Sequence, residues 1–317
     1  MFGKLGNKII FGDSRSMREI PNNSIHLVVT SPPYYNAPFD FPGLFSSYEE
    51  YLDLLRDVGR EVLRVLQNGR NACFVTQDVR IDGKLYPIVA DLIRVMVYEV
   101  GFEYQEKLVW RKPEGYIRIS RRSGVLVQHP YPMYYYPDNI YEEIVVFKKP
   151  GEFKRNSVPQ DVKELSRINI AKFQTEKWYL SVWDITNVLP NEKWSKYTAA
   201  FPEELAKRLI TLYSYVEENV LDPFLGTGTT CAVASRLGRN CIGYEIDLEL
   251  KEVIEERLTM NKTLLEYMGG EYVKVEFVVR ENAKNLRTKL REVIEKKLAE
   301  KDSSDKKRKN QTRTEGD

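Results

Sequence analysis

A serine, two prolines and a tyrosine end an apolar segment near the start of the chain. Residues 28–36 read VVTSPPYYN, so the apolar run stops at Ser31 and continues as Pro32, Pro33 and Tyr34. The prolines remove two backbone donors and fix two φ angles, which makes this segment a stiff corner. Such a corner can hold its oxygen atoms still beside a flat ligand. Taken alone, the motif is equally compatible with a Pro-Pro turn and a core tyrosine.

A glycine-rich loop lies in the second half of the chain, within VLDPFLGTGTT. It lacks the lysine of a phosphate-binding loop, and Cys231 stands where a dinucleotide fingerprint would have its third glycine. Gly226 and Gly228 let the backbone approach a ligand closely. Glu245 ends the next predicted strand roughly 20 residues after Asp222, the distance at which a strand-end carboxylate reaches a ribose diol. The loop predicts a nucleoside ligand without a pyrophosphate, and S-adenosylmethionine fits; alone, it could also be a plain glycine turn.

The composition is that of an ordinary globular protein. The chain has 317 residues, of which 42% are hydrophobic and 30% charged, with a net charge of +2. Three cysteines (Cys73, Cys231, Cys241) without paired spacing and two histidines predict buried thiols and no metal site. No apolar run is long enough to span a membrane and the amino terminus lacks a signal-peptide pattern, so we expect a cytoplasmic protein.

The elements that would position these residues alternate between strands and helices. Strands are predicted at 8–11, 25–30, 72–76, 103–110, 143–147, 220–222 and 241–244, and helices at 47–69, 86–98, 201–213 and 230–237. This alternation predicts an α/β, doubly wound and mostly parallel sheet. Residues 111–196 are irregular and rich in basic and aromatic side chains, which favours a functional insertion. A helical appendage with a helix at 282–300 and a charged, disordered tail are expected after residue 270.

The two motifs together resemble the amino-group DNA methyltransferases, which methylate exocyclic nitrogens of cytosine or adenine. TSPPY precedes DPFLGTGTT, as in the β arrangement of that family, and FGDS, NACFVTQD, EEIVVFKK, AAFPEELAKRLI and IGYEID also match. The resemblance covers roughly residues 8 to 260. It implies a Rossmann-like S-adenosylmethionine-dependent methyltransferase fold. Its parts would be a catalytic half (1–110), target-recognition loops with one returning strand at about 140–149 (111–196), a cofactor half (197–269) and the appendage (270–317).

The resemblance also implies roles for individual residues. Asp13 would lie near the adenine of the cofactor, Glu245 on its ribose hydroxyls, and Thr227 and Thr229 near its methionine end, beside the helix that follows Phe201. The implied catalytic residues are Ser31, Pro32, Pro33 and Tyr34, and the implied cofactor-binding residues are Asp13, Asp222, Phe224, Gly226, Thr227, Gly228, Thr229 and Glu245. Tyr197 stands where many relatives have a histidine, so no contact is assigned to it.

These residue types suit methylation of an amino group. The lone pair of an exocyclic amine is conjugated into the ring, so acceptors aimed at its N–H groups favour attack on a sulfonium methyl. The Ser31 hydroxyl and the Pro32 carbonyl are the candidate acceptors, and Tyr34 can stack on the base, which must be flipped out of the duplex. Neither a metal nor a covalent enzyme intermediate is required.

DNA contacts are expected in the irregular region, where cations alternate with aromatic rings. The predicted DNA-binding residues are Arg111, Lys112, Arg118, Arg121, Arg122 and Trp178. Most of these could individually be solvated loop charges or packing aromatics.

The function that follows is site-specific transfer of a methyl group to N4 of cytosine in double-stranded DNA, because Ser at the first motif position is commoner among the N4 enzymes. Adenine N6 is the alternative, followed by RNA or a protein amide; a nucleoside- or DNA-binding protein without catalysis is the rival from another class. The resemblance also implies a restriction-modification role with a partner endonuclease. The recognition sequence and the choice between monomer and homodimer stay open.

Overall fold

The fold is built around one large sheet. The computed structural model of the chain describes residues 6–37, 43–113, 128–133, 135, 137, 139–187, 201–267 and 275–286. The sheet strands are β1 (Asn7–Phe11), β2 (Ile25–Thr30), β3 (Leu66–Thr76), β6 (Glu103–Arg111), β7 (Tyr141–Lys148), β8 (Val182–Asp184), β9 (Asn219–Asp222), β10 (Asn240–Glu245) and β11 (Val275–Val279). Their order is β11-β1-β10-β9-β2-β3-β7-β6-β8. Every neighbouring pair is parallel except the two that β7 makes with β3 and β6.

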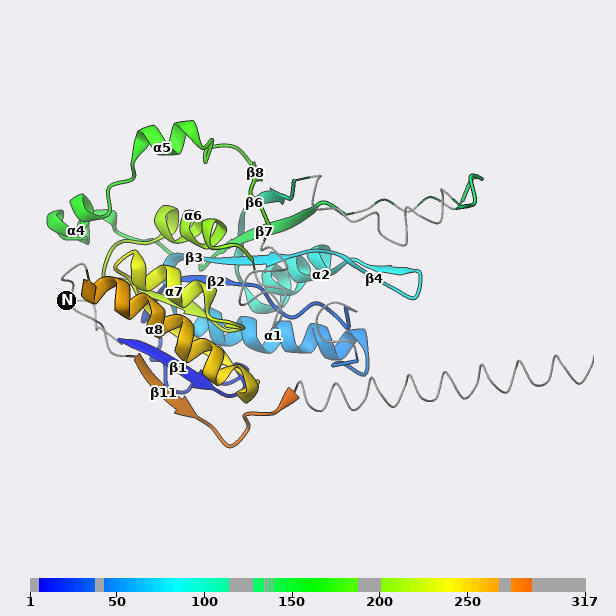
Figure 1. The fold of residues 1–317 in the computed structure, drawn as a ribbon, viewed down its shortest axis with the longest axis horizontal. Coiled ribbons are helices and arrows are strands. Elements are labelled where there is room, and N and C mark those ends of the chain that lie inside the picture. Colours follow the sequence, from blue (N-terminus) through cyan, green and yellow to red (C-terminus); the bar gives the residue numbers. More distant parts are fainter. Residues whose placement is uncertain are drawn as a thin grey trace, which may run out of the picture.

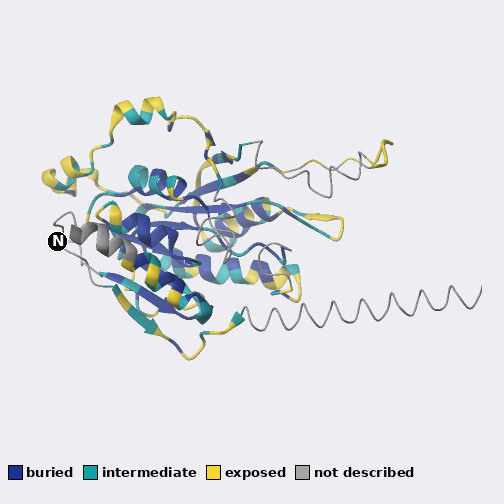
Figure 2. Ribbon diagram, in the orientation of Figure 1, coloured by how far each residue is buried: buried dark blue, intermediate teal, exposed yellow. Residues whose placement is uncertain are grey.

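Helices cover both faces of this sheet (Figure 1). One face carries α1 (Tyr48–Val65) and α2 (Ile88–Arg94), which a π-helical segment, Val95–Val100, continues. The other face carries α6 (Glu203–Tyr213), α7 (Thr229–Arg236) and α8 (Lys251–Tyr267). The short helices α4 (Gln160–Leu165) and α5 (Ile170–Thr175) lie outside this core and are largely exposed (Figure 2). A separate hairpin, β4 (Val79–Ile81) and β5 (Lys84–Tyr86), packs against the α1 side of the core through the buried side chain of Val79. The predicted doubly wound α/β fold is thus confirmed.

Strand β2 shows why the apolar pattern predicted this fold. All six of its residues are buried. Ile25 and Val28 belong to the apolar cluster under α1, whereas Leu27 and Val29 belong to the cluster under α6 and α7. Alternate side chains of a strand point to opposite faces, so a strand covered on both faces must be apolar throughout.

The parallel strands that carry the two motifs end at one edge of the sheet. Phe11, the last residue of β1, lies opposite Glu245, the last of β10, and Asp222 of β9 lies opposite Gly243. Strand β2 pairs in parallel with β9 and ends nearby at Thr30. The chain turns one way after β9 and the other way after β2, so a crevice is expected where β9 and β2 meet.

Helix α1 begins as predicted but ends earlier. The Ser47 hydroxyl accepts a hydrogen bond from the backbone N–H of Glu50 at 3.1 Å, the arrangement of a helix cap. The predicted end at 68–69 is wrong, because the helix stops at Val65 and β3 starts at Leu66. Pairing of Leu66 with Ile25 of β2 draws these residues into the sheet.

The carboxyl-terminal part of the described chain returns to the sheet instead of forming only a helical appendage. Strand β11 lies parallel to β1 at the sheet edge, with Asn7 opposite Val275 and Phe11 opposite Val279. The alternating, β-branched sequence VEFVV favours a strand here. Most of the predicted helix 282–300 lies outside the described residues. In the described part of the chain, no helix has the length and apolar character that crossing a membrane requires.

Candidate active site

Both sequence motifs open onto one cleft at the carboxyl edge of the sheet. Its lining residues from the predicted site are Asp13, Ser31, Pro32, Pro33, Tyr34, Phe224, Gly226, Thr227, Thr229 and Glu245. Two predicted cofactor residues, Asp222 and Gly228, do not line it. Phe201 contributes to the wall, as the position of its helix led us to expect.

The catalytic loop directly follows β2, and a hydrogen bond to β7 holds its tyrosine in place. Tyr34 is 3% exposed, and its hydroxyl donates a hydrogen bond of 2.6 Å to Oε2 of Glu142 on β7. The other oxygen of Glu142 accepts a 2.6 Å hydrogen bond from Nζ of Lys112. Glu142, which the sequence did not single out, therefore ties the catalytic loop to the strand that returns from the irregular region.

Asp222 lies beneath the cleft, where it joins three elements. Its carboxylate accepts hydrogen bonds from the hydroxyls of Thr30 and Thr230, each at 2.6 Å, and from the backbone N–H of Phe224 at 3.0 Å. Burial raises the pKa of Asp222 to about 6, although these hydrogen bonds act to lower it. Its position indicates that it holds β2, the glycine loop and α7 together; a direct contact with the cofactor stays a prediction.

The glycine loop and Glu245 are connected directly. The backbone N–H of Gly226 donates to Oε2 of Glu245 at 2.8 Å, and that of Asp247 donates to Oε1 at 2.9 Å. Gly228 caps α7 with a left-handed backbone (φ 87°), which glycine adopts without strain. Thr227 is buried, and its hydroxyl accepts a 2.9 Å hydrogen bond from Arg257. The loop that would hold a nucleoside is therefore pre-formed.

Asp13 lines the cleft from the segment that directly follows β1. Its carboxylate receives Nε and Nη2 of Arg15 at 2.9 and 2.6 Å and the backbone N–H of Arg15 at 2.9 Å. Burial acts to raise the pKa of Asp13, but the hydrogen bonds from Arg15 outweigh it and hold the pKa below its ordinary value. An ionised Asp13 can accept hydrogen bonds but cannot donate one.

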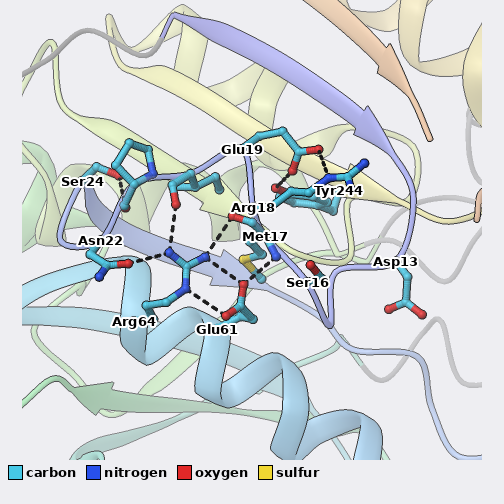
Figure 3. Close-up of polar contacts among 12 residues, drawn as sticks. Asp13, Ser16, Met17, Arg18, Glu19, Asn22, Ser24, Glu61, Arg64 and Tyr244 are labelled. Carbon is cyan, nitrogen blue, oxygen red and sulfur yellow. Dashed lines mark hydrogen bonds and ion pairs between the residues drawn. The ribbon is translucent and has the colours of Figure 1, made fainter.

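The segment that carries Asp13 is anchored to α1 (Figure 3). Glu61 accepts a hydrogen bond from the backbone N–H of Met17 at 2.5 Å, and Arg64 donates to the carbonyl of Met17 at 2.9 Å and to Asn22 at 2.7 Å. Charge-assisted bonds of this kind are among the stronger ones in proteins. The connection between β1 and β2 is therefore tied to α1 by side-chain hydrogen bonds at Met17 and Asn22.

The predicted DNA-binding residues fall into three groups. Arg118, Arg121 and Arg122 lie outside the described residues. Arg111 is exposed and pairs with Asp184 of β8, with Nε 2.5 Å from Oδ1. Lys112 faces inward to Glu142, and Trp178 is 5% exposed with its indole N–H bonded to Glu176. Neither Lys112 nor Trp178 lines the cleft, and a DNA contact by either residue stays a prediction.

The prediction of buried free thiols is wrong for two of the three cysteines. Cys231 of α7 and Cys241 of β10 form a disulfide, whereas Cys73 is a buried free thiol. The two partners lie ten residues apart in the sequence, and the helix-to-strand return brings them together. Among the residues that the structure describes, no group of three or more His, Cys, Asp or Glu side chains could hold a metal ion.

The comparison with known proteins identifies the family. The sequence profile of the DNA methylase family, for N6 and N4 methyltransferases, matches residues 25–256, and the chain belongs to this family. It is therefore an S-adenosylmethionine-dependent DNA methyltransferase of the amino group. The order of its motifs places it in the β group, so the predicted resemblance, fold and cofactor are confirmed.

Its relatives include type II methyltransferases of restriction-modification systems. The chain is 34% identical to the type II methyltransferase M.MjaI of Methanocaldococcus jannaschii, over 86% of this chain and 97% of that protein. It is 33% identical to M.MthZI of Methanothermobacter thermautotrophicus, over 89% and 85%. Among solved structures, a DNA modification methylase of Thermus thermophilus in complex with S-adenosyl-L-methionine superposes with a TM-score of 0.67 at 30% identity, over 86% of this chain and 98% of that one.

Several residues at the site were not predicted from the sequence. Glu142 lies within EEIVVFKK, but nothing in that string indicates a contact with Tyr34, which is 108 residues away. Arg15 directly follows FGDS, two residues after Asp13, and this spacing could have predicted the pair of hydrogen bonds from its guanidinium to the Asp13 carboxylate. Lys284 and Leu286 also line the cleft, from a segment that the sequence assigned to an appendage.

Proposed function

We propose that the chain transfers a methyl group from S-adenosylmethionine to the exocyclic N4 of a cytosine flipped out of duplex DNA. One observation carries this proposal: the acceptors of Ser31–Tyr34 and the nucleoside-binding features around Gly226 and Glu245 line the same cleft. Two separate sites would not allow an in-line transfer, whereas a shared cleft can align nitrogen, methyl and sulfur.

The residues that would hold the cofactor fit its chemistry. Glu245 lines the cleft with a carboxylate, whose oxygens each have two lone pairs and can accept hydrogen bonds from ribose hydroxyls as well as from the backbone. Apolar residues, including Phe224 and Leu250, line the same cleft and suit a purine ring. When bound, the cofactor supplies an electrophilic methyl group on a sulfonium.

The catalytic loop would act on the amino group. The hydroxyl oxygen of Ser31 and the carbonyl oxygen of Pro32 accept hydrogen bonds from the two N–H groups of the exocyclic amine. These hydrogen bonds concentrate the lone pair on nitrogen and stabilise the positive charge that develops there. The bond from Tyr34 to Glu142 holds the tyrosine ring in one orientation at the cleft wall. A fixed ring can stack on an extruded base without losing side-chain entropy at that moment.

The choice of cytosine rests on Ser31, and adenine N6 is the second candidate. Ser-Pro-Pro-Tyr is commoner in the N4 group, but a relative of this chain, at 26% identity over 86% of its length, is the DNA adenine methyltransferase YhdJ of Escherichia coli. We further propose that a partner endonuclease reads the same DNA sequence, in line with the type II names of the relatives.

The test is to incubate the protein with labelled S-adenosylmethionine and duplex DNA free of N4 and N6 methylation, and to separate the digested nucleosides. Label in N4-methylcytosine supports the proposal, and label in N6-methyladenine supports the second candidate. Ser31→Ala should lower single-turnover rate strongly, while Ser157→Ala, an exposed serine far along the chain, serves as the matched control. Label confined to RNA or protein would refute both candidates.

A further inference from the structure

The segment after β11 crosses the carboxyl end of β1, which Asp13 follows, and the carboxyl end of β10, which Glu245 closes. Its path is fixed by backbone hydrogen bonds at both sides. The N–H of Arg280 donates to the carbonyl of Phe11 at 2.8 Å, at the end of β1. Four residues later, Lys284 donates its N–H to the carbonyl of Ile246 at 2.7 Å, just beyond β10.

Arg280 grips the loop that carries Asp13. Its guanidinium is buried, and Nη1 donates to the carbonyls of Asp13 at 3.0 Å and Ser16 at 2.7 Å. Nε donates to Glu19 at 2.8 Å, and the same guanidinium lies over the ring of Tyr244, 5.3 Å from its centroid. Five donors in one planar fork allow a single side chain to fix two carbonyls and a carboxylate.

The rest of the segment is bound to the loop after Glu245. The carbonyl of Lys284 accepts a hydrogen bond from the N–H of Leu248 at 2.8 Å, and the N–H of Leu286 donates to the buried carboxylate of Asp247 at 3.1 Å. The backbone N–H of Asp247 in turn donates to Glu245. Lys284 and Leu286 both line the cleft.

We propose that residues 280–286 form a wall of the cofactor pocket in addition to the residues of the two motifs. In this wall, Leu286 and Lys284 contact the nucleoside end of the cofactor, and Arg280 is a positioning residue for Asp13. The segment combines an apolar residue for a purine face with the ammonium of Lys284, whose charge acts on the carboxylates of Asp13 and Glu50. It goes beyond the transfer chemistry, because it assigns cofactor affinity to a segment outside both motifs and outside residues 25–256 that the family profile matches.

The proposal predicts a loss of cofactor affinity that is separate from DNA binding and from the chemical step. Kd for S-adenosylmethionine and for S-adenosylhomocysteine is measured on the full chain by titration calorimetry without DNA, for Leu286→Ala, Lys284→Ala and Arg280→Ala. Leu286→Ala and Arg280→Ala should each raise Kd at least fivefold, and Lys284→Ala at least twofold. The rate at saturating cofactor and the Kd for duplex DNA should stay within twofold of the wild type.

Glu281→Ala is the matched control, because Glu281 is exposed, lies in the same segment and does not line the cleft. It should leave Kd unchanged. Should Arg280→Ala fail to fold, Leu286→Ala decides, since its backbone contacts stay in place. If the cofactor Kd of Leu286→Ala stays within twofold of the wild type, the proposal that residues 280–286 contact the cofactor is overturned. If Arg280→Ala changes the rate at saturating cofactor but leaves the cofactor Kd unchanged, the positioning role of Arg280 is overturned. Because no DNA is present in the binding measurement, the choice of methylated base does not affect this result.

Discussion

Replacing Asp222 by asparagine should change the pH dependence of stability in a direction that the site dictates. The Asp222 carboxylate is fully buried, and three donors from β2, the glycine loop and α7 converge on it. Asparagine keeps the shape and one acceptor oxygen but cannot ionise. The difference in unfolding free energy between the two proteins therefore isolates the ionisation of this one group.

The size of the effect follows from the pKa of Asp222, which burial raises from 3.8 to about 6. A difference of about two pKa units corresponds to about 3 kcal/mol between the charged and neutral forms. Below pH 3.8 the group is neutral in both the folded and unfolded states, so this contribution vanishes. Above pH 6 it is charged in both, and the folded state carries the full cost. Wild-type stability relative to Asp222→Asn should thus fall by about 3 kcal/mol as pH rises from 3.8 through 6.

A second buried group makes the comparison of two proteins necessary. Burial and the nearby Arg70 lower the pKa of His26 from 6.5 to about 3. The unfolded chain therefore binds a proton that the folded chain does not, and stability is lost as pH falls from 6.5 toward 3. This loss is common to both proteins and cancels in their difference.

The assay is urea unfolding of wild type and Asp222→Asn without cofactor, at several pH values between about 3.5 and 7.5. Asp161→Asn is the matched control, because Asp161 lies exposed on α4 and should alter stability by less than about 0.5 kcal/mol. A difference between wild type and Asp222→Asn that stays flat over this range, or that changes in the opposite direction, would refute the account of a desolvated carboxylate holding the site together.

Two further predictions concern the catalytic loop and the disulfide. Tyr34→Phe should lower the unfolding free energy by about 1–3 kcal/mol, because Glu142 loses a donor while it stays buried; unchanged urea stability would show that this hydrogen bond contributes nothing. Replacing both Cys231 and Cys241 by alanine should cost about 3 kcal/mol, the chain-entropy value for a loop of this length. Denatured, unreduced protein should accordingly expose one thiol per chain in a thiol titration, and three thiols would contradict the disulfide.

The sequence predicted the elements whose signals are local. The continuous apolar run of β2 and the cap at Ser47 both indicate their structure within a few residues, and the parallel topology then brings Ser31 and Gly226 to the same edge. The contacts that complete the site are not local. Tyr34 meets Glu142 and Asp13 meets Arg280 across 108 and 267 residues, and no periodicity encodes such pairs.

The sequence also does not show which of its cationic and aromatic side chains are buried. Trp178 and Lys112 are residue types that often contact nucleic acids. In the structure, however, the ring of Trp178 is buried, and the ammonium of Lys112 pairs with the buried carboxylate of Glu142. The same residue types serve packing and recognition, so composition cannot distinguish the two roles. The disulfide was missed for a related reason: Cys231 and Cys241 become neighbours only after the helix-to-strand return has formed.

The place of β1 in the sheet bears on the order in which the protein can fold during synthesis. Strand β1 is made first, but its two neighbours, β10 and β11, are made more than 200 residues later. At about 5–20 residues per second, the ribosome takes roughly 10–50 s to supply them. Over that time the apolar NKIIF segment has no native partner, and Asp13 has no loop to face. A partly synthesised chain can form the α1 side of the sheet, but cofactor capture must await the last strands.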